Sequence, residues 1–378
     1  MITYHQLGGD KRLCDIVVAG SHDAGITGGG ANVQTQNLEI FEQATAGVRV
    51  FDLRIAATKA STDSSAPVLL KAFHADPKLM VNKEKKGKDI FDLGGRKGNV
   101  TTTKLPVDGA FGMRLPEMLR QACDFVKYNT SEFLILKFDK CTNWRVIADI
   151  CVNEIGNYLY IGAGSLNEKT LDNLRKKVVV LFTGSGLDAI SGYHGAHTGI
   201  WGCKSLTKGG SYDSGYDGLQ YIGKGGTDPL DGASDMGKIA SNIVKQGNLM
   251  RIGAASTDPE VMGMMYWTTT GLKRSIQERD NTMWGEDKQP SLLSKLWQDG
   301  FGEAIESRLP VYTSPTAYAN GAVLKAFMPN IVMVDFADVH KGRFIHGLNT
   351  TATTMLTDAA RRIAAARQPQ RGRLAGLF

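Results

Sequence analysis

The chain has 378 residues, of which 42% are hydrophobic and 22% are charged, and its formal net charge is +6. This is the composition of a globular protein, and it excludes a disordered or low-complexity chain. No apolar stretch approaches the ~18 residues that a membrane-spanning helix requires. Five scattered cysteines without Cys-x-x-Cys spacing argue for reduced thiols and against a disulfide framework or a zinc site. The charge is compatible with contact to an anionic lipid surface. No nucleic-acid-binding motif is present, so we expect no nucleic-acid partner, and the sequence predicts no particular oligomeric state.

The first predicted strand, at residues 15–19, leads into a loop that begins with ionisable residues. Residues 20–25 read Gly-Ser-His-Asp-Ala-Gly, so His22 and Asp23 stand where a buried strand opens into a glycine-rich loop. Strand ends that lead into flexible loops are where α/β folds usually hold their reactive groups. His22 and Asp23 are therefore the first candidates for a functional site.

Two further predicted strands also carry ionisable side chains near their ends. The run at 48–55 contains Asp52 and Arg54, which point to the same face of a strand because they are two residues apart. The run at 68–74 ends in His74. Buried ionisable groups are costly unless they are paired or functional, so their presence on three successive strands predicts one shared active site.

The rest of the chain alternates between strand-like and helical patterns. Further strands are predicted at 133–138, 178–182, 262–268 and 331–336, and one more between 199 and 255, where 199–203 and 249–254 are the alternatives. Helices are predicted at 37–46, from Pro116 onward and at 166–176. Strands that alternate with helices form right-handed parallel units, and about eight of them predict an α/β fold, a closed (β/α)₈ barrel of the TIM type in an irregular form.

A single domain is predicted, because no linker or internal repeat divides the chain. We expect one catalytic barrel at residues 1–360, with long insertions at 75–110 and 204–240 on the strand-end face beside the site. Arginines crowd the last segment, so residues 361–378 are predicted to be a basic tail outside the barrel. The first residues do not read as a secretory signal, so we expect a chain that is mature as written, that stays in the cell that makes it, or that leaves by a route without a cleaved signal. Cytoplasmic synthesis without a signal peptide is the expectation, with delivery into another cell by a signal-independent route as one hypothesis.

These residues resemble a known family. Residues 20–25, followed by Gly-Val-Arg-Val-Phe-Asp-Leu-Arg at 47–54, resemble the X-domain of phosphatidylinositol-specific phospholipase C in its bacterial form. Later segments match in the same order, namely Phe73-His74, 115–126, 129–136, 266–268 and 331–336. The resemblance is specific over the first 75 residues and looser after about 140. It implies a TIM-type barrel and a phospholipase C that cleaves phosphatidylinositol, or a related lipid, to diacylglycerol and a cyclic inositol phosphate.

Cleaving a phosphodiester by an internal hydroxyl requires a base, an acid and positive charge near the phosphate oxygens. Two imidazoles suit the proton transfers, and an arginine matches phosphate geometry. The resemblance implies that His22 is the base and His74 the acid, with Asp23 as the partner of His74. It also implies that Asp335, on the last strand, orients His22. Asp52 is expected to hold Arg54 and the imidazole in register.

Arg54 also bears on the metal question. In the calcium-dependent members of the superfamily an acidic residue occupies this place and binds the ion, whereas an arginine would repel a divalent cation. The resemblance therefore implies a metal-independent enzyme, and we expect no metal and no cofactor.

The substrate is less well specified than the reaction. A basic residue of the fourth strand binds inositol in the bacterial family, and Lys137, Asp139 and Lys140 are the candidates for that place. Tyr266 and Trp267 are expected either to line the pocket or to belong to the core. The expected partners are a phospholipid and a membrane surface. Two alternatives stay open: a non-catalytic X-domain module that binds lipid, and a phosphodiesterase for a non-inositol substrate.

Overall fold

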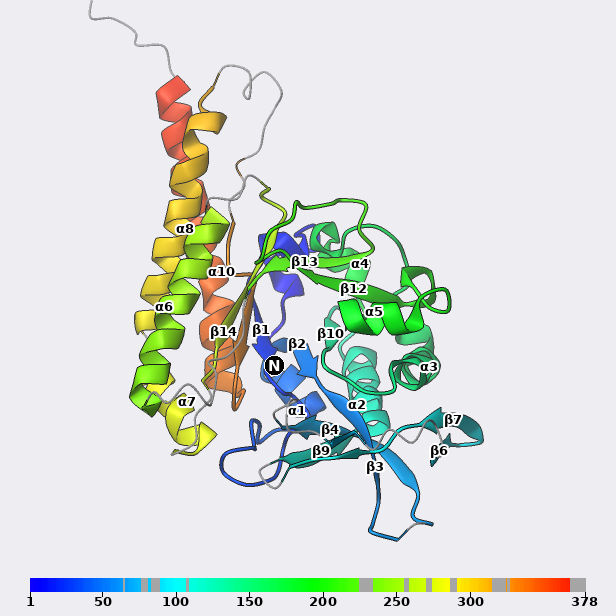
Figure 1. Ribbon diagram of the computed structural model, residues 1–378. Helices are drawn as coiled ribbons and strands as arrows, with labels where there is room; N and C mark the ends of the chain where they lie inside the picture. The colour runs from blue at the N-terminus through cyan, green and yellow to red at the C-terminus, as the bar shows by residue number, and fades with distance from the viewer. Residues whose placement is uncertain are drawn as a thin grey trace, which may run out of the picture.

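Eight parallel strands close into a barrel at the centre of the molecule (Figure 1). The computed structural model describes residues 1–63, 65–75, 81–82, 89–106, 109–223, 234–254, 258–269, 274–285, 291–314, 324 and 327–367. The barrel strands, in order around the ring, are β1 (Val18–Ser21), β2 (Val48–Leu53), β10 (Phe133–Phe138), β11 (Lys177–Thr183), β12 (Ile200–Ser205), β13 (Gly218–Ile222), β14 (Met262–Trp267) and β15 (Ile331–Val334), which pairs with β1. The predicted fold class is confirmed.

The barrel strands are apolar on both faces because both faces are covered. On β10, Ile135 points into the barrel interior, while Leu134 and Leu136 pack between the barrel and the surrounding helices. A parallel strand buried on both sides is expected to read as a nearly continuous apolar run. This is why the sequence indicated most of these strands.

The prediction of a single strand between 199 and 255 was correct in its first alternative, 199–203, which is β12, and missed β13. The segment between 199 and 255 supplies two barrel strands, β12 and β13, so the predicted insertion at 204–240 contains a barrel strand. The alternative at 249–254 is the end of helix α6 (Asp235–Ala254). β13 was not predicted because it lies in a segment rich in glycine, serine and aspartate, where no apolar run stands out.

β4 (Val68–His74) is a strand but does not belong to the barrel. It pairs in antiparallel fashion with β3 (Ile55–Lys59) and β9 (Ala110–Arg114) in a separate sheet beside the strand ends (Figure 1). Its residues alternate between buried and half-buried positions, as in a sheet with one covered face. The predicted strand at 48–55 is likewise divided at Arg54 into β2 and β3.

The remaining elements surround this core. The helices are α1 (Ile40–Thr45), α2 (Leu115–Tyr128), α3 (Trp144–Ile155), α4 (Leu171–Leu174), α5 (Gly184–Ile190), α6, α7 (Ile276–Trp284), α8 (Ser291–Tyr312) and α10 (Val339–Arg367). Short strands form two small ribbons in the predicted 75–110 insertion, β5 (Val81–Asn82) with β8 (Thr103–Lys104) and β6 (Asp89–Leu93) with β7 (Arg96–Val100). The helix predicted at 166–176 shrinks to a 3₁₀ turn, Leu166–Glu168, and α4.

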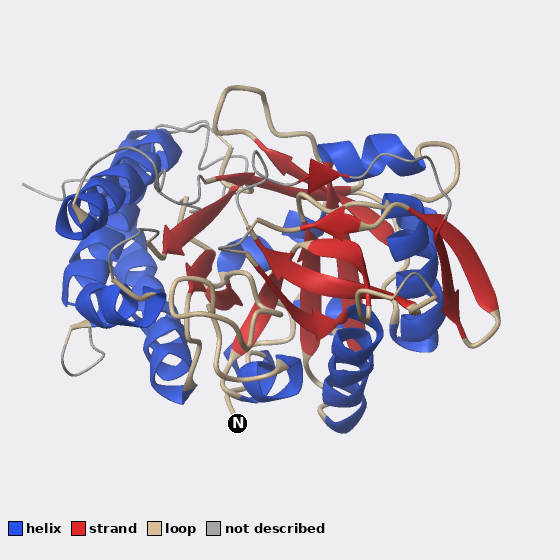
Figure 2. Ribbon diagram, turned by 60° about the horizontal axis from the view of Figure 1, so that its bottom comes forward, coloured by secondary structure: helices blue, strands red, loops and turns tan. Residues whose placement is uncertain are grey.

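Three long helices, α6, α8 and α10, pack side by side along the flank of the barrel next to β14 (Figures 1 and 2). No described helix is both long enough and apolar enough to cross a bilayer. The predicted domain boundary at 360 falls inside α10. Ile363 is buried, and Nη1 of Arg362 lies 2.5 Å from Oε1 of Glu306 on α8, so residues 361–367 are folded with the bundle. The rest of the predicted tail, 368–378, lies outside the described residues.

Candidate active site

Most of the predicted site residues lie at the carboxyl ends of the barrel strands β1, β2, β10, β14 and β15. β1 ends at Ser21, so His22 and Asp23 follow it directly, and the backbone N of His22 donates to the carbonyl of Val334 on β15 at 3.0 Å. Asp23 has a positive φ of 43°, a conformation that residues other than glycine rarely adopt. The chain therefore turns sharply at Asp23, and this turn places two consecutive ionisable side chains at the mouth of the barrel.

His22 and Asp335 are joined by a hydrogen bond. Nδ1 of His22 lies 2.9 Å from Oδ1 of Asp335, and both residues are buried. The contact exists because β15 closes the barrel against β1, which brings together residues 313 positions apart. The structure thus places Asp335 where the resemblance implied.

Asp23 is the centre of the ionic cluster. Its Oδ2 lies 3.4 Å from Nε2 of His22 and 3.6 Å from Nε2 of His74, and its Oδ1 lies 3.0 Å from Nε of Arg54. The sequence prediction gave Asp23 only one partner, His74. His74 reaches it from β4, outside the barrel, so the active-site cluster draws on two sheets.

Several polar atoms of this cluster are buried without a hydrogen-bond partner. Among the described protein atoms, both carboxylate oxygens of Asp23, Nε of Arg54 and Nδ1 of His74 have none of suitable geometry. Buried polar groups are nearly always hydrogen-bonded, and an unsatisfied group calls for an explanation. A concentration of such atoms around two histidines and an arginine is expected of a site that receives a polar ligand.

Asp52 pairs directly with Lys137 and acts on Arg54 only through its charge, which corrects the predicted direct contact. Oδ1 of Asp52 lies 2.8 Å from Nζ of Lys137, its register partner on β10, and both side chains are buried. The direct partner of Arg54 is Asp23 instead. The reason is that the barrel strand ends at Leu53, so Arg54 no longer follows the alternation that places Asp52 inside the barrel.

The three candidates on and after β10 occupy different environments. Lys137 is buried inside the barrel. Asp139 is half-buried, lies 3.9 Å from Nζ of Lys137 and accepts a hydrogen bond from Oγ1 of Thr183 at 3.2 Å. The side chain of Lys140 is exposed. Of the three candidates, only Lys137 therefore lies inside the barrel, and Asp139 lies beside it.

Tyr266 and Trp267 are consecutive on β14 and point to opposite faces. The ring of Tyr266 lies edge-on to His22, with 6.0 Å between the ring centroids. Trp267 packs in the core between the barrel and the helices and is fully buried there. Trp267 does not reach the site, so its place among the substrate-binding candidates was wrong.

Tyr221, on β13, was missed because β13 itself was not predicted. It packs against the interior cluster that contains Tyr266, and it interacts electrostatically with Lys137. The alternation in Gly-Leu-Gln-Tyr-Ile at 218–222 was the available signal, since it puts Leu219 and Tyr221 on one face.

The carboxylates give the two histidines different proton affinities. Burial lowers the pKa of His22, but the charges of Asp23 and Asp335 and the Asp335 hydrogen bond outweigh it and raise this pKa to about 9. The pKa of His74 is lowered, because burial, Arg54 and His22 together outweigh Asp23. Burial raises the pKa of Asp23, but Arg54, His22 and His74 lower it to about 2. At neutral pH the site therefore holds one charged imidazole, one neutral imidazole and an ionised carboxylate.

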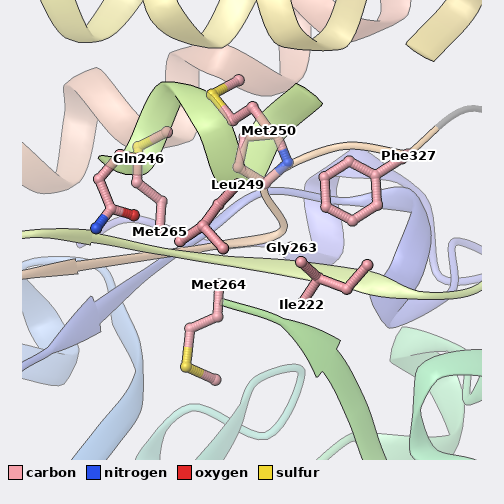
Figure 3. Close-up of a pocket in the computed structure, with 9 residues that line it drawn as sticks. Ile222, Gln246, Leu249, Met250, Gly263, Met264, Met265 and Phe327 are labelled. Atoms are coloured by element: carbon pink, nitrogen blue, oxygen red, sulfur yellow. The ribbon is translucent and has the colours of Figure 1, made fainter. Parts of the chain in front are cut away.

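A small cavity elsewhere in the molecule is unrelated to this chemistry. It lies between α6, β13, β14 and Phe327, and its lining is apolar except for Gln246 (Figure 3). Among the described residues, no group of three or more histidines, cysteines or acidic residues is arranged to hold a metal ion. Metal independence itself stays a prediction.

No protein-family model and no curated protein sequence matches the chain. Among solved structures, the chain is similar to a phosphatidylinositol-specific phospholipase C of S. aureus, with 13% identity and a TM-score of 0.50, over 90% of this chain and 95% of that chain. A phosphatidylinositol-specific phospholipase C from Listeria monocytogenes aligns over the same shares with 14% identity and a TM-score of 0.44. At this level of identity the likeness to the S. aureus protein establishes a shared barrel fold.

Proposed function

We propose that the chain is a phosphodiesterase of the phospholipase C type that cleaves phosphatidylinositol, or a related phospholipid, to diacylglycerol and a cyclic inositol phosphate. The observation that carries the proposal is the contact of one buried imidazole (His22), one half-buried imidazole (His74) and one guanidinium (Arg54) with a single carboxylate, that of Asp23. The fold shared with a bacterial phosphatidylinositol-specific phospholipase C supports it.

The reaction divides into two proton transfers. A hydroxyl of the head group attacks the phosphorus and loses its proton to the base, while the bond between phosphorus and the diacylglycerol oxygen breaks and that oxygen takes a proton from the acid. Arg54 faces the charge that builds up on the non-bridging oxygens. Following the resemblance, we assign His22 as the base and His74 as the acid.

The protonation states of the two histidines without substrate favour the alternative assignment, in which His74 is the base and His22 the acid. His22, with a pKa of about 9, is protonated at neutral pH, whereas His74, with its lowered pKa, is neutral. With His22 as the base, His22 must be neutral and His74 charged when the substrate is bound. The anionic phosphate of the substrate promotes this state because it favours a charged His74. The two assignments differ in which histidine serves the leaving group, and this difference can be measured.

The surroundings of Asp23 support the proposal that the reaction needs no metal ion. A divalent cation would have to approach a carboxylate that already lies beside Arg54 and two histidines, and the guanidinium charge would repel it. Positive charge at the phosphate is supplied by Arg54 instead.

The head group is proposed to lie beside Lys137, Tyr266 and Tyr221. Lys137 and Asp52 form a buried pair, and the Tyr266 ring lies next to His22. An ammonium, a carboxylate and phenol groups together offer donors and acceptors to several hydroxyls. This set favours a hydroxyl-rich head group, presented at the surface of a membrane.

A panel of lipid head groups tests the proposal. Vesicles that contain phosphatidylinositol, phosphatidylcholine, phosphatidylethanolamine or phosphatidylglycerol are incubated with the protein, and diacylglycerol is measured. We expect release from phosphatidylinositol and none with the His22→Ala variant. Binding to vesicles without turnover on any lipid would favour the non-catalytic module, and turnover confined to another head group would favour the non-inositol phosphodiesterase.

A further inference from the structure

A second buried ion pair lies directly behind Asp335. Nζ of Lys341 is 2.5 Å from Oδ2 of Asp280, and the same Nζ donates to the backbone carbonyl of Asp335 at 2.6 Å. The side chains of Lys341 and Asp280 are only 2% and 4% exposed. None of the proton transfers proposed above uses either residue.

The pair joins two helices to the end of β15. Lys341 lies in the first turn of α10, which begins after Asp338, whose Oδ1 accepts from the backbone N of His340 and of Lys341 at 2.9 Å each. Asp280 lies on α7, near Trp284, whose ring centroid is 5.2 Å from Nζ of Lys341. The ammonium is therefore held by a carboxylate, a carbonyl and an aromatic face at once.

The chain turns sharply where Lys341 reaches back. Phe336 has a positive φ of 45°, so the direction of β15 changes immediately after Asp335. On the side of β1, the backbone N of Phe336 donates to the carbonyl of Thr35 at 2.7 Å, and that of Ala337 donates to Oε1 of Gln36 at 2.9 Å. Lys341 supplies the restraint from the helix side.

Stability alone explains this pair poorly. Moving two charges out of water carries a desolvation penalty that their attraction often fails to recover, and apolar replacements of buried pairs are often neutral or stabilising. One oxygen of the Asp280 carboxylate, Oδ1, also has no hydrogen-bond partner among the described atoms. A buried pair of this kind is better explained by the geometry that it imposes on its neighbour.

We propose that Lys341 and Asp280 form a positioning pair that holds the Asp335 carboxylate against Nδ1 of His22 and so sets the proton-transfer competence of His22. Its effect on turnover rests on the proposed function, whereas its effect on His22 does not. Lys341 acts through the Asp335 backbone, and Asp280 acts by holding Lys341. Arg279, the buried neighbour of Asp280 on α7, also interacts electrostatically with Asp335 and is left unchanged in the test.

The test measures the pKa of His22 by NMR of its imidazole signals, without substrate, in Lys341→Met and Asp280→Asn. The other titratable groups that face His22, namely Asp23, Arg54, His74 and Tyr266, are present in both variants. We expect the pKa of His22 to fall from about 9 toward its ordinary value of 6.5, because Asp335 moves from its place. In a turnover assay, kcat should fall about 10- to 100-fold with KM unchanged, as for other outer partners of functional histidines.

A matched control comes from another buried pair. Nη2 of Arg49 lies 2.8 Å from Oε2 of Glu132, both side chains are fully buried, and the pair stands at the amino-terminal end of β2 and β10. Arg49→Met should lower stability and leave the pKa of His22 unchanged. In an Asp335→Asn background, Lys341→Met should produce no further shift, because both substitutions act on the same contact.

Folded Lys341→Met and Asp280→Asn proteins with an unchanged His22 pKa would overturn the positioning role, as would an equal shift in Arg49→Met. If Lys341→Met does not fold, the double variant Lys341→Met/Asp280→Asn, which leaves no unpaired charge, is measured in the same way and against the same two outcomes. A shifted His22 pKa in a protein whose wild type turns over no phospholipid would contradict the proposed function and leave the positioning pair in place.

Discussion

His22 and His74 approach the same atom, Oδ2 of Asp23, at 3.4 Å and 3.6 Å, although they belong to different sheets. His22 follows barrel strand β1, whereas His74 ends β4 in the antiparallel sheet. A shared carboxylate between two imidazoles couples their proton affinities, because a proton on one disfavours a proton on the other.

Loss of either imidazole should abolish most of the activity. His22→Ala and His74→Ala are each expected to lower kcat by about 10²- to 10⁴-fold, the usual contribution of general acid–base catalysis. Near-UV and far-UV circular dichroism should show an unchanged fold. Variants that keep more than a tenth of wild-type kcat on phosphatidylinositol would remove the histidines from the mechanism.

The nature of the leaving group separates the two role assignments. A substrate with an activated leaving group needs little help from the acid, so it should rescue the variant that lacks the acid far more than the variant that lacks the base. With His74 as the acid, rescue appears in His74→Ala. Rescue of His22→Ala instead would establish the reverse roles, and equal rescue of both variants would contradict either assignment.

The pH dependence should be bell-shaped. Catalysis requires one neutral and one charged histidine, and the pH profile has the same two limbs whichever histidine plays which role. We expect kcat/KM to decline above about pH 9, where His22 loses its proton. On the acid side, kcat/KM should decline below pH 6.5, where His74 gains a proton. Asp335→Asn should move the basic limb to lower pH because it removes one of the carboxylates that hold the His22 proton. A basic limb that stays in place in Asp335→Asn would contradict the His22–Asp335 link.

The ion pair of His22 and Asp335 predicts that the free energy of unfolding depends on pH. The pKa of His22 is about 9 in the folded chain against an ordinary 6.5, so the folded state favours the charged imidazole. This contribution is fully present below pH 6.5 and is lost as the pH rises through 9. Urea unfolding should therefore show a difference between wild type and Asp335→Asn that is larger at pH 6 than at pH 10, and a difference independent of pH would count against it.

The two neighbours on β14 should respond in opposite ways. Trp267→Ala removes a fully buried ring from the outer core and should cost about 3–5 kcal/mol of the free energy of unfolding, with kcat retained in the folded fraction. Tyr266→Phe should alter KM and leave the Tm nearly unchanged. Thermal unfolding and steady-state kinetics measured on both variants check this pair, and a loss of kcat confined to the Trp267 variant would contradict it.

The sequence predicted the parts of the molecule that follow regular periodicity. β10 and β11 were recognised because a short uninterrupted apolar run rich in valine, such as 178–182, is typical of a strand buried on both sides. His22, Asp23 and His74 were chosen as candidates because buried ionisable groups at successive strand ends are costly unless they are used, and the structure brings the three side chains together.

Other features depended on contacts that no periodicity records. The assignment of β4 to a second sheet depends on antiparallel pairing with β9, some 40 residues away, and pairing leaves little trace in one strand. The exchange of partners, Asp52 with Lys137 and Arg54 with Asp23, depends on where β2 ends, and element boundaries are the least predictable part of a pattern. Lys341 and Asp280 lie on helices whose sequences are ordinary, so only the fold shows that they meet.

The central claim is tested most directly by ³¹P NMR of the reaction with phosphatidylinositol vesicles in excess EDTA. The arrangement of His22, His74 and Arg54 predicts that the resonance of a cyclic inositol phosphate grows as fast with EDTA as without it. The His22→Ala/His74→Ala protein should give no such resonance. Turnover that disappears in EDTA and returns with Ca²⁺ would contradict the role given to Arg54, and the absence of a phosphorus-containing product under all conditions would contradict the proposed activity itself.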